Sequence, residues 1–230
     1  MTVSLGFFKK IKQWIIAEGT DQVLFRPFQT NGNPYKSRVF LVSAYATPVL
    51  KVEENSEQVF IDALVNADLF EELYSPQLDN ASREVKGSLQ FAAWMNKAHG
   101  ENIVLTSINT YQTNDAKELK VVKKEDLVNY QRGIDIFMEV VNEFQPDVII
   151  LQGSAAVEQF KALYTEQLVI LHPEMTKVQE LENAGPFAEI YYKNGKVVKI
   201  FATRSMAYFG KDGSTFGAFK EKLQEVLGNS

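Results

Sequence analysis

The sequence predicts an α/β protein built as a three-layer α/β/α sandwich. We expect helices on both faces of a mostly parallel central sheet, which has about four strands plus a hairpin edge. Three observations predict this class: short apolar runs alternate with longer amphipathic segments, the first three runs are nearly continuous in β-branched and aliphatic residues, and an Asn-Gly pair separates two later apolar runs. This alternation is typical of parallel strands that are buried on both faces.

The N-terminal segment, residues 1–37, is predicted to form a helix and a loop that pack on a single domain of residues 1–230. Phe8, Ile11 and Ile15 make an apolar stripe at helical spacing, with lysines around it. A helix on a membrane surface is the alternative interpretation of this stripe. The segment lacks the pattern of a signal peptide, and no stretch of the chain approaches ~18 uninterrupted apolar residues, so we expect no membrane span.

The remaining elements follow in chain order. The predicted strands are residues 38–43, 102–107, 147–152 and 197–203. Helices are predicted at 56–74, 82–98 and 125–144, the last ending before Pro146, and again at 154–163 and 216–227. Residues 188–193 and 196–201 flank Asn194-Gly195, which predicts an antiparallel hairpin. Lysines and acids alternate over residues 115–126, which indicates a solvated mixed-charge segment more than a nucleic-acid track.

The composition of the chain excludes several kinds of chemical site. The chain has 230 residues, no cysteine, two histidines and a net charge of −5. Without cysteine it forms no disulfide and no cysteine-ligated iron–sulfur cluster, which is typical of a cytoplasmic protein. Two histidines do not make a three-histidine metal centre, and we expect neither a metal nor a cofactor. The negative charge argues against a broad basic face for nucleic acid, although a local basic groove stays open.

Polar and aromatic side chains follow the predicted strands, and open parallel sheets bind ligands beyond the carboxyl ends of their strands. Amides, hydroxyls and rings suit a planar, uncharged, hydrogen-bonding ligand, whereas a metal or phosphate site needs carboxylates or clustered cations. The turn after the third strand offers backbone donors at a helix N-terminus, or simply allows close packing of helix and sheet. The side chains or turn positions concerned are Ser43, Tyr45, Asn109, Gly153, Ser154 and Ser205.

The order of these segments resembles the uracil-DNA glycosylase superfamily over about residues 38–228. Residues 43–48, Ser-Ala-Tyr-Ala-Thr-Pro, take the place of the loop that carries the water-activating residue in that family. Asn109 is similar to the asparagine that recognises the base, and residues 152–156 resemble the family's Gly-Ser/Arg-x-Ala turn. The segment from Asn194 to Met206 resembles the hairpin, strand and minor-groove loop of some branches. The resemblance implies the fold of that superfamily.

The chain departs from the family pattern at its catalytic positions. Tyr45 or Ala44 stands where an Asp, Glu or Asn is expected, and Arg204-Ser205-Met206 replaces a His-Pro-Ser loop. A competing alignment puts that loop at His172-Pro173, but the order of hairpin, strand, loop and closing helix favours the first. The resemblance therefore implies the following candidates: Tyr45, Ser205 or alternatively His172 for catalysis; Ser43, Tyr45, Asn109, Gly153 and Ser154 for base binding; Arg204 and Ser205 for DNA contact; and Glu53, Glu54 and Asp62 as more distant acids.

We expect a divergent member of this superfamily that binds DNA or a nucleobase, with weak or altered base-excision activity. The alternative is a noncatalytic module of the same fold that binds a nucleotide or a protein partner; the missing catalytic groups favour it. A small-molecule hydrolase or transferase on a generic doubly wound sheet is a third hypothesis, although a Gly-x-Ser-x-Gly elbow is absent. Two candidates also have plain structural interpretations: Asn109 as a turn cap and Tyr45 as a rim aromatic.

Overall fold

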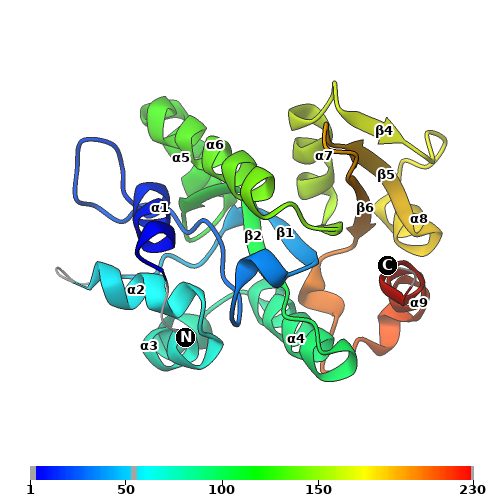
Figure 1. Ribbon diagram of the computed structural model, residues 1–230, viewed down its shortest axis with the longest axis horizontal. Coiled ribbons are helices and arrows are strands. Elements are labelled where there is room, and N and C mark those ends of the chain that lie inside the picture. Colours follow the sequence, from blue (N-terminus) through cyan, green and yellow to red (C-terminus); the bar gives the residue numbers. More distant parts are fainter. Residues whose placement is uncertain (1–3, 53–55, 229–230) are drawn as a thin grey trace.

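The computed structural model describes residues 4–52 and 56–228. Within them, one sheet of six strands has the order β2-β1-β3-β6-β5-β4 (Figure 1). Strands β1, β2, β3 and β6 are parallel, β5 is antiparallel to β6, and β4 is antiparallel to β5. The α/β class and the mostly parallel sheet are confirmed. The strands are β1 (Val39–Ala46), β2 (Val104–Gln112), β3 (Val148–Gln152), β4 (Leu168–Ile170), β5 (Pro186–Tyr191) and β6 (Val197–Thr203).

Helices cover both faces of this sheet. In Figure 1, α6 and α7 lie on one side of the strands, and α4 and α9 lie on the other. Of the helices described, none is long and apolar enough to cross a membrane. The helices are α1 (Leu5–Ile15), α2 (Glu57–Leu64), α3 (Ala67–Asp79), α4 (Arg83–His99), α5 (Ala116–Glu125), α6 (Leu127–Phe144), α7 (Ser154–Leu163), α8 (Val178–Ala184) and α9 (Gly217–Gly228), with a short 3₁₀ turn, η2 (Met206–Tyr208), after β6.

The alternation of side chains along β1 divides the core into two layers. Phe40 and Val42 pack in the layer of α6 and α7, whereas Val39 and Leu41 pack in the layer of α4 and α9. Successive side chains of a strand point to opposite faces, so a strand buried on both sides is apolar at every position. This is why the apolar runs in the sequence predicted the central strands.

One helical prediction needs correction, and one segment without a predicted element is a helix. The predicted helix at 56–74 is two helices, because Asn66 interrupts it and caps α3 by accepting a hydrogen bond from the backbone of Leu69 at 3.1 Å. The mixed-charge segment is also a helix, α5, and its carboxylate cap Asp115 accepts from the backbone of Lys117 and Glu118 at 2.7 and 2.9 Å. Both helices begin at an N-cap residue, and the spacing of apolar residues alone does not reveal such a cap.

The N-terminal helix α1 packs against the helical layer that contains α6. Ile11, Trp14 and Ile15 are buried in the same core as α6. The indole nitrogen of Trp14 donates to the carboxylate of Glu139 on α6 at 2.7 Å. The apolar stripe of α1 is therefore covered by its own chain.

The segment after α1 runs along the outer edge of β2. The backbones of Gln29 and Leu105 exchange two hydrogen bonds of 2.8 Å, and the backbone of Arg26 donates to the carbonyl of Thr110 at 2.9 Å. Residues 24–30 thus pair with a strand that would otherwise leave its backbone groups open. The same pairing places Gln29 beside Leu105 near the start of β2 and Arg26 beside Thr110 near its end.

Candidate ligand-binding pocket

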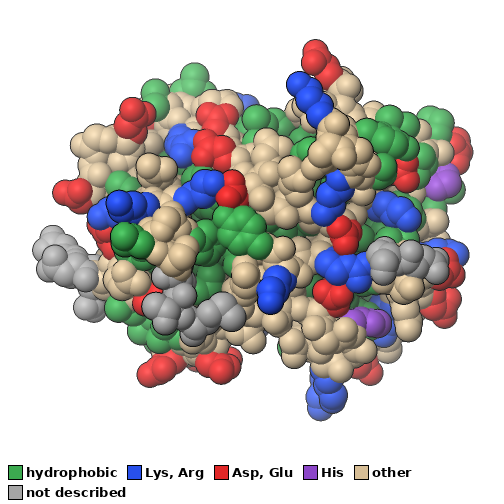
Figure 2. All heavy atoms as spheres, in the orientation of Figure 1, with side chains coloured by type: hydrophobic (Ala, Val, Ile, Leu, Met, Phe, Trp, Pro, Cys, Tyr) green, Lys and Arg blue, Asp and Glu red, His purple; other side chains and the backbone are tan. Residues whose placement is uncertain are grey.

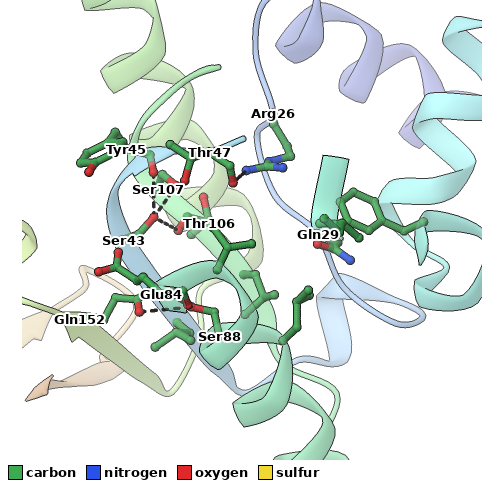
Figure 3. A pocket seen from close by; sticks show the side chains of 16 residues that line it. Arg26, Gln29, Ser43, Tyr45, Thr47, Glu84, Ser88, Thr106, Ser107 and Gln152 are labelled. Carbon is green, nitrogen blue, oxygen red and sulfur yellow. Dashed lines mark hydrogen bonds between the residues drawn. The ribbon is translucent and has the colours of Figure 1, made fainter. Parts of the chain in front are cut away.

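A pocket of about 60 Å³ is lined by residues of β1, by the first half of β2 and by the last residue of β3, on the side of the sheet that α4 covers. Its wall combines strand ends with the first turns of α4, part of α3 and residues from the segment 24–30 (Figure 3). Apolar side chains such as Phe70 and Leu89 close it on the side of α3 and α4. The polar residues that matter below are Arg26, Ser43, Tyr45, Glu84, Ser107 and Gln152.

Two serine hydroxyls form the floor of the pocket. Ser43 and Ser107 are register partners on β1 and β2, and their oxygens lie 2.7 Å apart. Ser43 follows Val39 and Leu41 on the face of β1 that packs towards α4, so the apolar side chains of that face end in a hydroxyl as the strand leaves the core. The hydroxyl of Ser43 also lies within donating distance of the backbone carbonyls of Tyr45 and Thr106, at 3.1 and 3.4 Å. When it donates to one of them, Ser107 donates to Ser43, and the lone pairs that remain can accept a hydrogen bond from a ligand.

An amide from the third strand completes the wall. Gln152 is the last residue of β3 and is buried, with 6% of its surface exposed. Its amide nitrogen donates to the hydroxyl of Ser88 on α4 at 3.0 Å, and its amide oxygen accepts from the backbone of Met206 at 3.4 Å. The side chain is thereby fixed between the sheet, α4 and η2.

Two charged side chains face the pocket from opposite sides (Figure 3). On one side, a carboxylate oxygen of Glu84 accepts a hydrogen bond from the hydroxyl of Ser205 at 2.6 Å. On the other, the guanidinium of Arg26 donates to the backbone carbonyl of Thr47. Burial lowers the pKa of Arg26 to about 10, so the guanidinium remains protonated at neutral pH.

Tyr45 stands at the rim of the pocket. Burial raises the pKa of its phenol above the ordinary value, and the negative charges of Glu84 and Asp115 raise it further. The phenol therefore stays protonated and keeps its hydrogen-bond donor at neutral pH. Over the described part of the chain, no group of three or more His, Asp or Glu residues is placed to hold a metal ion.

The structure brings Ser43 and Tyr45 together in the pocket, as β1 predicts, and places Ser205 beside them through Glu84. Asn109, expected to bind a base, does not line the pocket. It is 1% exposed, and its amide donates to the carbonyl of Tyr130 on α6 at 3.0 Å and accepts from the backbone of Tyr111 at 3.0 Å. Its hydrogen-bonding groups are used within the protein.

Asn109 is buried because β2 is longer than the sequence predicted. The strand continues to Gln112, where a loop was predicted, and its register with β1 shifts between Tyr45 and Ala46. Past Ser107 its polar side chains reach α6, which approaches so closely that a Cβ on Gly133 would lie 2.2 Å from the Asn109 amide oxygen. Asn109 thus ties β2 to α6 and has no open side towards a ligand.

Gly153 and Ser154, also expected at the base site, lie outside the pocket. Gly153 has a φ of 82°, begins α7, and donates its N–H to the carbonyl of Thr203 at 2.7 Å. Ser154 is the exposed first residue of α7. A Cβ on Gly153 would meet no atom within 4 Å, so the turn requires glycine for its positive φ and not for close packing.

Arg204, expected from sequence to contact DNA, makes several contacts within the protein. Its Nε lies 3.3 Å from the buried carboxylate of Glu182, and its guanidinium carbon lies 4.6 Å from the ring centre of Phe216. A second bond joins the guanidinium to the carbonyl of Thr215, and the backbone of Arg204 donates to Glu182 at 2.8 Å. The side chain is held against its own domain.

His172 does not reach the pocket either. It follows β4, at the opposite edge of the sheet from β2, and its Nδ1 lies 3.6 Å from the carboxylate of Glu174. Among the acids considered from sequence, Asp62 accepts a hydrogen bond from Gln58 within α2. Glu53 and Glu54 lie outside the described residues.

Of the six polar pocket residues singled out above, four were missed from sequence. Ser107 and Gln152 are the last residues of the predicted second and third strands, so the rule about carboxyl ends could have found them. Arg26 and Glu84 come from a loop and a helix start, and nothing in the sequence indicated that they meet these strands. The acid near Tyr45 thus enters from α4 and not from the loop after β1.

A larger groove of about 570 Å³ adjoins the pocket between α3 and α4. Both cavities share walls made by Gln29, Phe70, Leu78, Leu89 and Leu105. The groove has an apolar floor and a rim that carries Glu71, Asp79 and Lys86. The two cavities together offer space for a ligand larger than the pocket alone would take.

No family model and no curated protein matches the chain. Its function is therefore inferred from the pocket.

Proposed function

We propose that the chain is a divergent member of the uracil-DNA glycosylase superfamily that binds a nucleobase, free or within DNA, in this pocket. One observation carries the proposal: Ser43, Ser107 and Gln152, from three neighbouring strands, line a single pocket to which Tyr45 also contributes. α/β sheets bind ligands at this edge, and a few convergent polar groups in a mostly apolar wall are typical of small-molecule sites.

The chemistry of these groups suits a base. The edge of a nucleobase presents hydrogen-bond donors and acceptors side by side, and hydroxyl and amide side chains match both. The ring of Tyr45 can stack on the flat face of the base, an interaction worth ~1–3 kcal/mol. The adjoining groove between α3 and α4 then supplies room for the sugar.

The distribution of charge favours a free base or a nucleotide over a long duplex. The net charge is −5, and Figure 2 shows basic and acidic side chains interspersed over the face in view. A protein that neutralises many phosphates needs a continuous basic track, and its affinity then falls steeply with salt. We expect only a shallow salt dependence for this protein.

A binding measurement tests the proposal. Uracil, other free bases and their nucleosides are titrated into the protein by calorimetry, and Tyr45→Ala is compared with Tyr208→Ala, an exposed tyrosine outside the pocket. We expect binding by the wild type, a loss of about 5- to 100-fold in Tyr45→Ala, and no change in Tyr208→Ala. Absence of binding by every base and nucleoside contradicts the proposal.

Glu84 favours a second candidate function, hydrolysis of an N-glycosidic bond. Its carboxylate lines the pocket and is oriented by Ser205, so it can take a proton from a water molecule that attacks the sugar carbon. The bond between sugar and base then breaks, and the base leaves with the electron pair and takes up a proton. A general base of this kind contributes about 10²–10⁴-fold.

Base release distinguishes the two candidates. Single-stranded and duplex DNA containing uracil, hypoxanthine or an alkylated base is incubated with wild type and with Glu84→Gln, whose amide oxygen can still accept from Ser205. Release by the wild type that falls about 10²–10⁴-fold in Glu84→Gln supports hydrolysis. A folded wild type that binds a base and releases none assigns the noncatalytic function.

A further inference from the structure

Arg26 is unusual among the side chains of the pocket. It is the one cation in the pocket wall, on a side chain that is only partly exposed. Over residues 4–52 and 56–228, no carboxylate forms an ion pair with it, and its guanidinium makes one hydrogen bond, to the carbonyl of Thr47. A guanidinium has five N–H donors, so most of its donor capacity is unused.

The other arginines differ from Arg26. Arg38, Arg132 and Arg204 each pair with a carboxylate, at distances from 2.5 to 3.3 Å. Arg83 makes no such pair among the described residues, but its side chain is exposed to water. Arg26 therefore combines two features that none of these four combines: partial removal from water and no acidic partner among the residues that the structure describes.

This combination has an energetic consequence. A charged group taken out of water without a partner destabilises the folded state, and an anion that binds to it recovers part of that cost. The shift in the pKa of Arg26 to about 10 reports the same lack of compensation, since a carboxylate partner would raise it. The planar fork of guanidinium donors matches the oxygens of a phosphate or carboxylate.

We infer that Arg26 binds the phosphate of a nucleotide whose base occupies the pocket. The inference rests on the proposed function for the base, and it names the ligand as a free nucleoside monophosphate. The phosphate lies on the Arg26 side and the base extends towards Ser43, Ser107 and Gln152, because Glu84 on the opposite side repels an anion. The net charge of −5 favours a small nucleotide over a nucleic-acid strand.

The first test uses the wild-type protein alone. The guanidinium Nε–H resonance of Arg26 is assigned by NMR and followed during titration with inorganic phosphate, uridine and uridine 5′-monophosphate. We expect phosphate and the monophosphate to shift this resonance and uridine to leave it nearly unchanged. If neither phosphate nor the monophosphate shifts it, the inference is overturned, and this result needs no variant that must fold.

The second test measures the preference for the charged ligand. Wild type should bind uridine 5′-monophosphate about 10- to 100-fold more tightly than uridine. Arg26→Gln should bind both equally, Arg26→Lys should keep part of the preference, and Arg83→Gln, the matched exposed arginine, should keep all of it. Equal binding of both ligands by the wild type overturns the inference and leaves the proposed base site standing.

Two further results separate this inference from the proposed function. Phosphate binding at Arg26 without any binding of uridine keeps the anion site and contradicts the base site. Tighter binding of a short single-stranded oligonucleotide than of the monophosphate, lost again in Arg26→Gln, keeps the contact between Arg26 and phosphate but overturns its assignment to a free nucleotide.

Discussion

The pocket and the cluster after β6 lie at the same edge of the sheet and contain the same kinds of charge, but they use them differently. In the cluster after β6, which consists of Glu182, Arg204, Thr215 and Phe216, the arginine and the carboxylate pair with each other. In the pocket, the guanidinium and the carboxylate lie on opposite sides, and among the described residues each forms a hydrogen bond with a neutral group. Charges paired within the protein stabilise the fold, whereas charges left apart are available to a ligand.

The two regions are joined by α4 and η2. Gly87 on α4 faces the backbone of Met206 so closely that a Cβ would lie 1.8 Å from its carbonyl oxygen. The contact holds Glu84 next to Ser205, which is the second residue after β6. A change at Gly87 should therefore disturb both regions, while changes within either region should stay local.

The largest effect is expected for Gly87→Ala. The new methyl group meets a backbone atom that cannot rotate away, so α4 and η2 must separate, and we expect a loss of about 3 kcal/mol in the free energy of unfolding. Urea denaturation measures it. Gly217→Ala, at a position with no atom within 4 Å of the added Cβ, is the control and should be nearly neutral. Equal stability of the two variants contradicts the close packing of α4 against η2.

Arg204→Ala should have the next largest effect. It leaves the carboxylate of Glu182, which is 6% exposed, buried without its cationic partner. Because Arg204 itself is partly exposed, we expect a loss of about 2 kcal/mol in the free energy of unfolding and no change in nucleotide affinity. Arg83→Ala, which removes an exposed arginine, should cost less than about 0.5 kcal/mol. A fall in affinity without a fall in stability would assign Arg204 to the ligand site after all.

Ser107→Ala should have the opposite effect to Arg204→Ala: it should lower the affinity for the nucleotide and change the stability little. Its hydroxyl bonds to that of Ser43 and faces the pocket, so we expect a loss of at most about 1 kcal/mol in stability and a loss of about 3- to 10-fold in affinity for the nucleotide. Calorimetry and urea denaturation on the same samples measure both. Ser154→Ala, at the exposed start of α7, should change neither. Unchanged affinity in Ser107→Ala would remove the hydroxyl pair from the binding site.

The smallest effect concerns pH. Burial raises the pKa of Glu182 above its ordinary value, against the opposing influence of Arg204. The folded protein therefore holds this proton more tightly than the unfolded chain, so the free energy of unfolding from this group is greatest below about pH 4.5 and falls as pH rises through the raised pKa. The difference between wild type and Glu182→Gln, measured from pH 4 to 7, should follow that slope. A slope of the opposite sign contradicts burial as the dominant cause.

The central strands could be predicted from sequence because burial on both faces requires apolar residues at every position. The end of β2 could not. Asn109 and Thr110 are polar enough for a loop, yet they form a strand because residues 24–30 pair with its outer edge and α6 accepts hydrogen bonds from both side chains. Polar residues become strand-forming when their partners come from distant parts of the chain, and local pattern does not report those partners.

The residues of the candidate site could also be predicted only in part from the sequence. Tyr45 and Ser43 follow from the position of β1, since the carboxyl ends of parallel strands share one edge. Arg26 and Glu84 are separated by more than fifty residues in sequence, and only the folded chain brings them to one pocket. The exposed charges of the sequence could be counted in advance, but which of them would find partners within the protein could not.

The pairing of residues 24–30 with β2 also affects how molecules of this protein meet one another. Because residues 24–30 pair with the outer edge of β2, that edge strand offers fewer free backbone N–H and C=O groups with which a second copy could extend the sheet. The opposite border ends in β4, which has three residues and makes a poor template for growth. Removing residues 24–30 would therefore expose an adhesive edge and delete Arg26 in one step, so aggregation and loss of anion recognition should arise together.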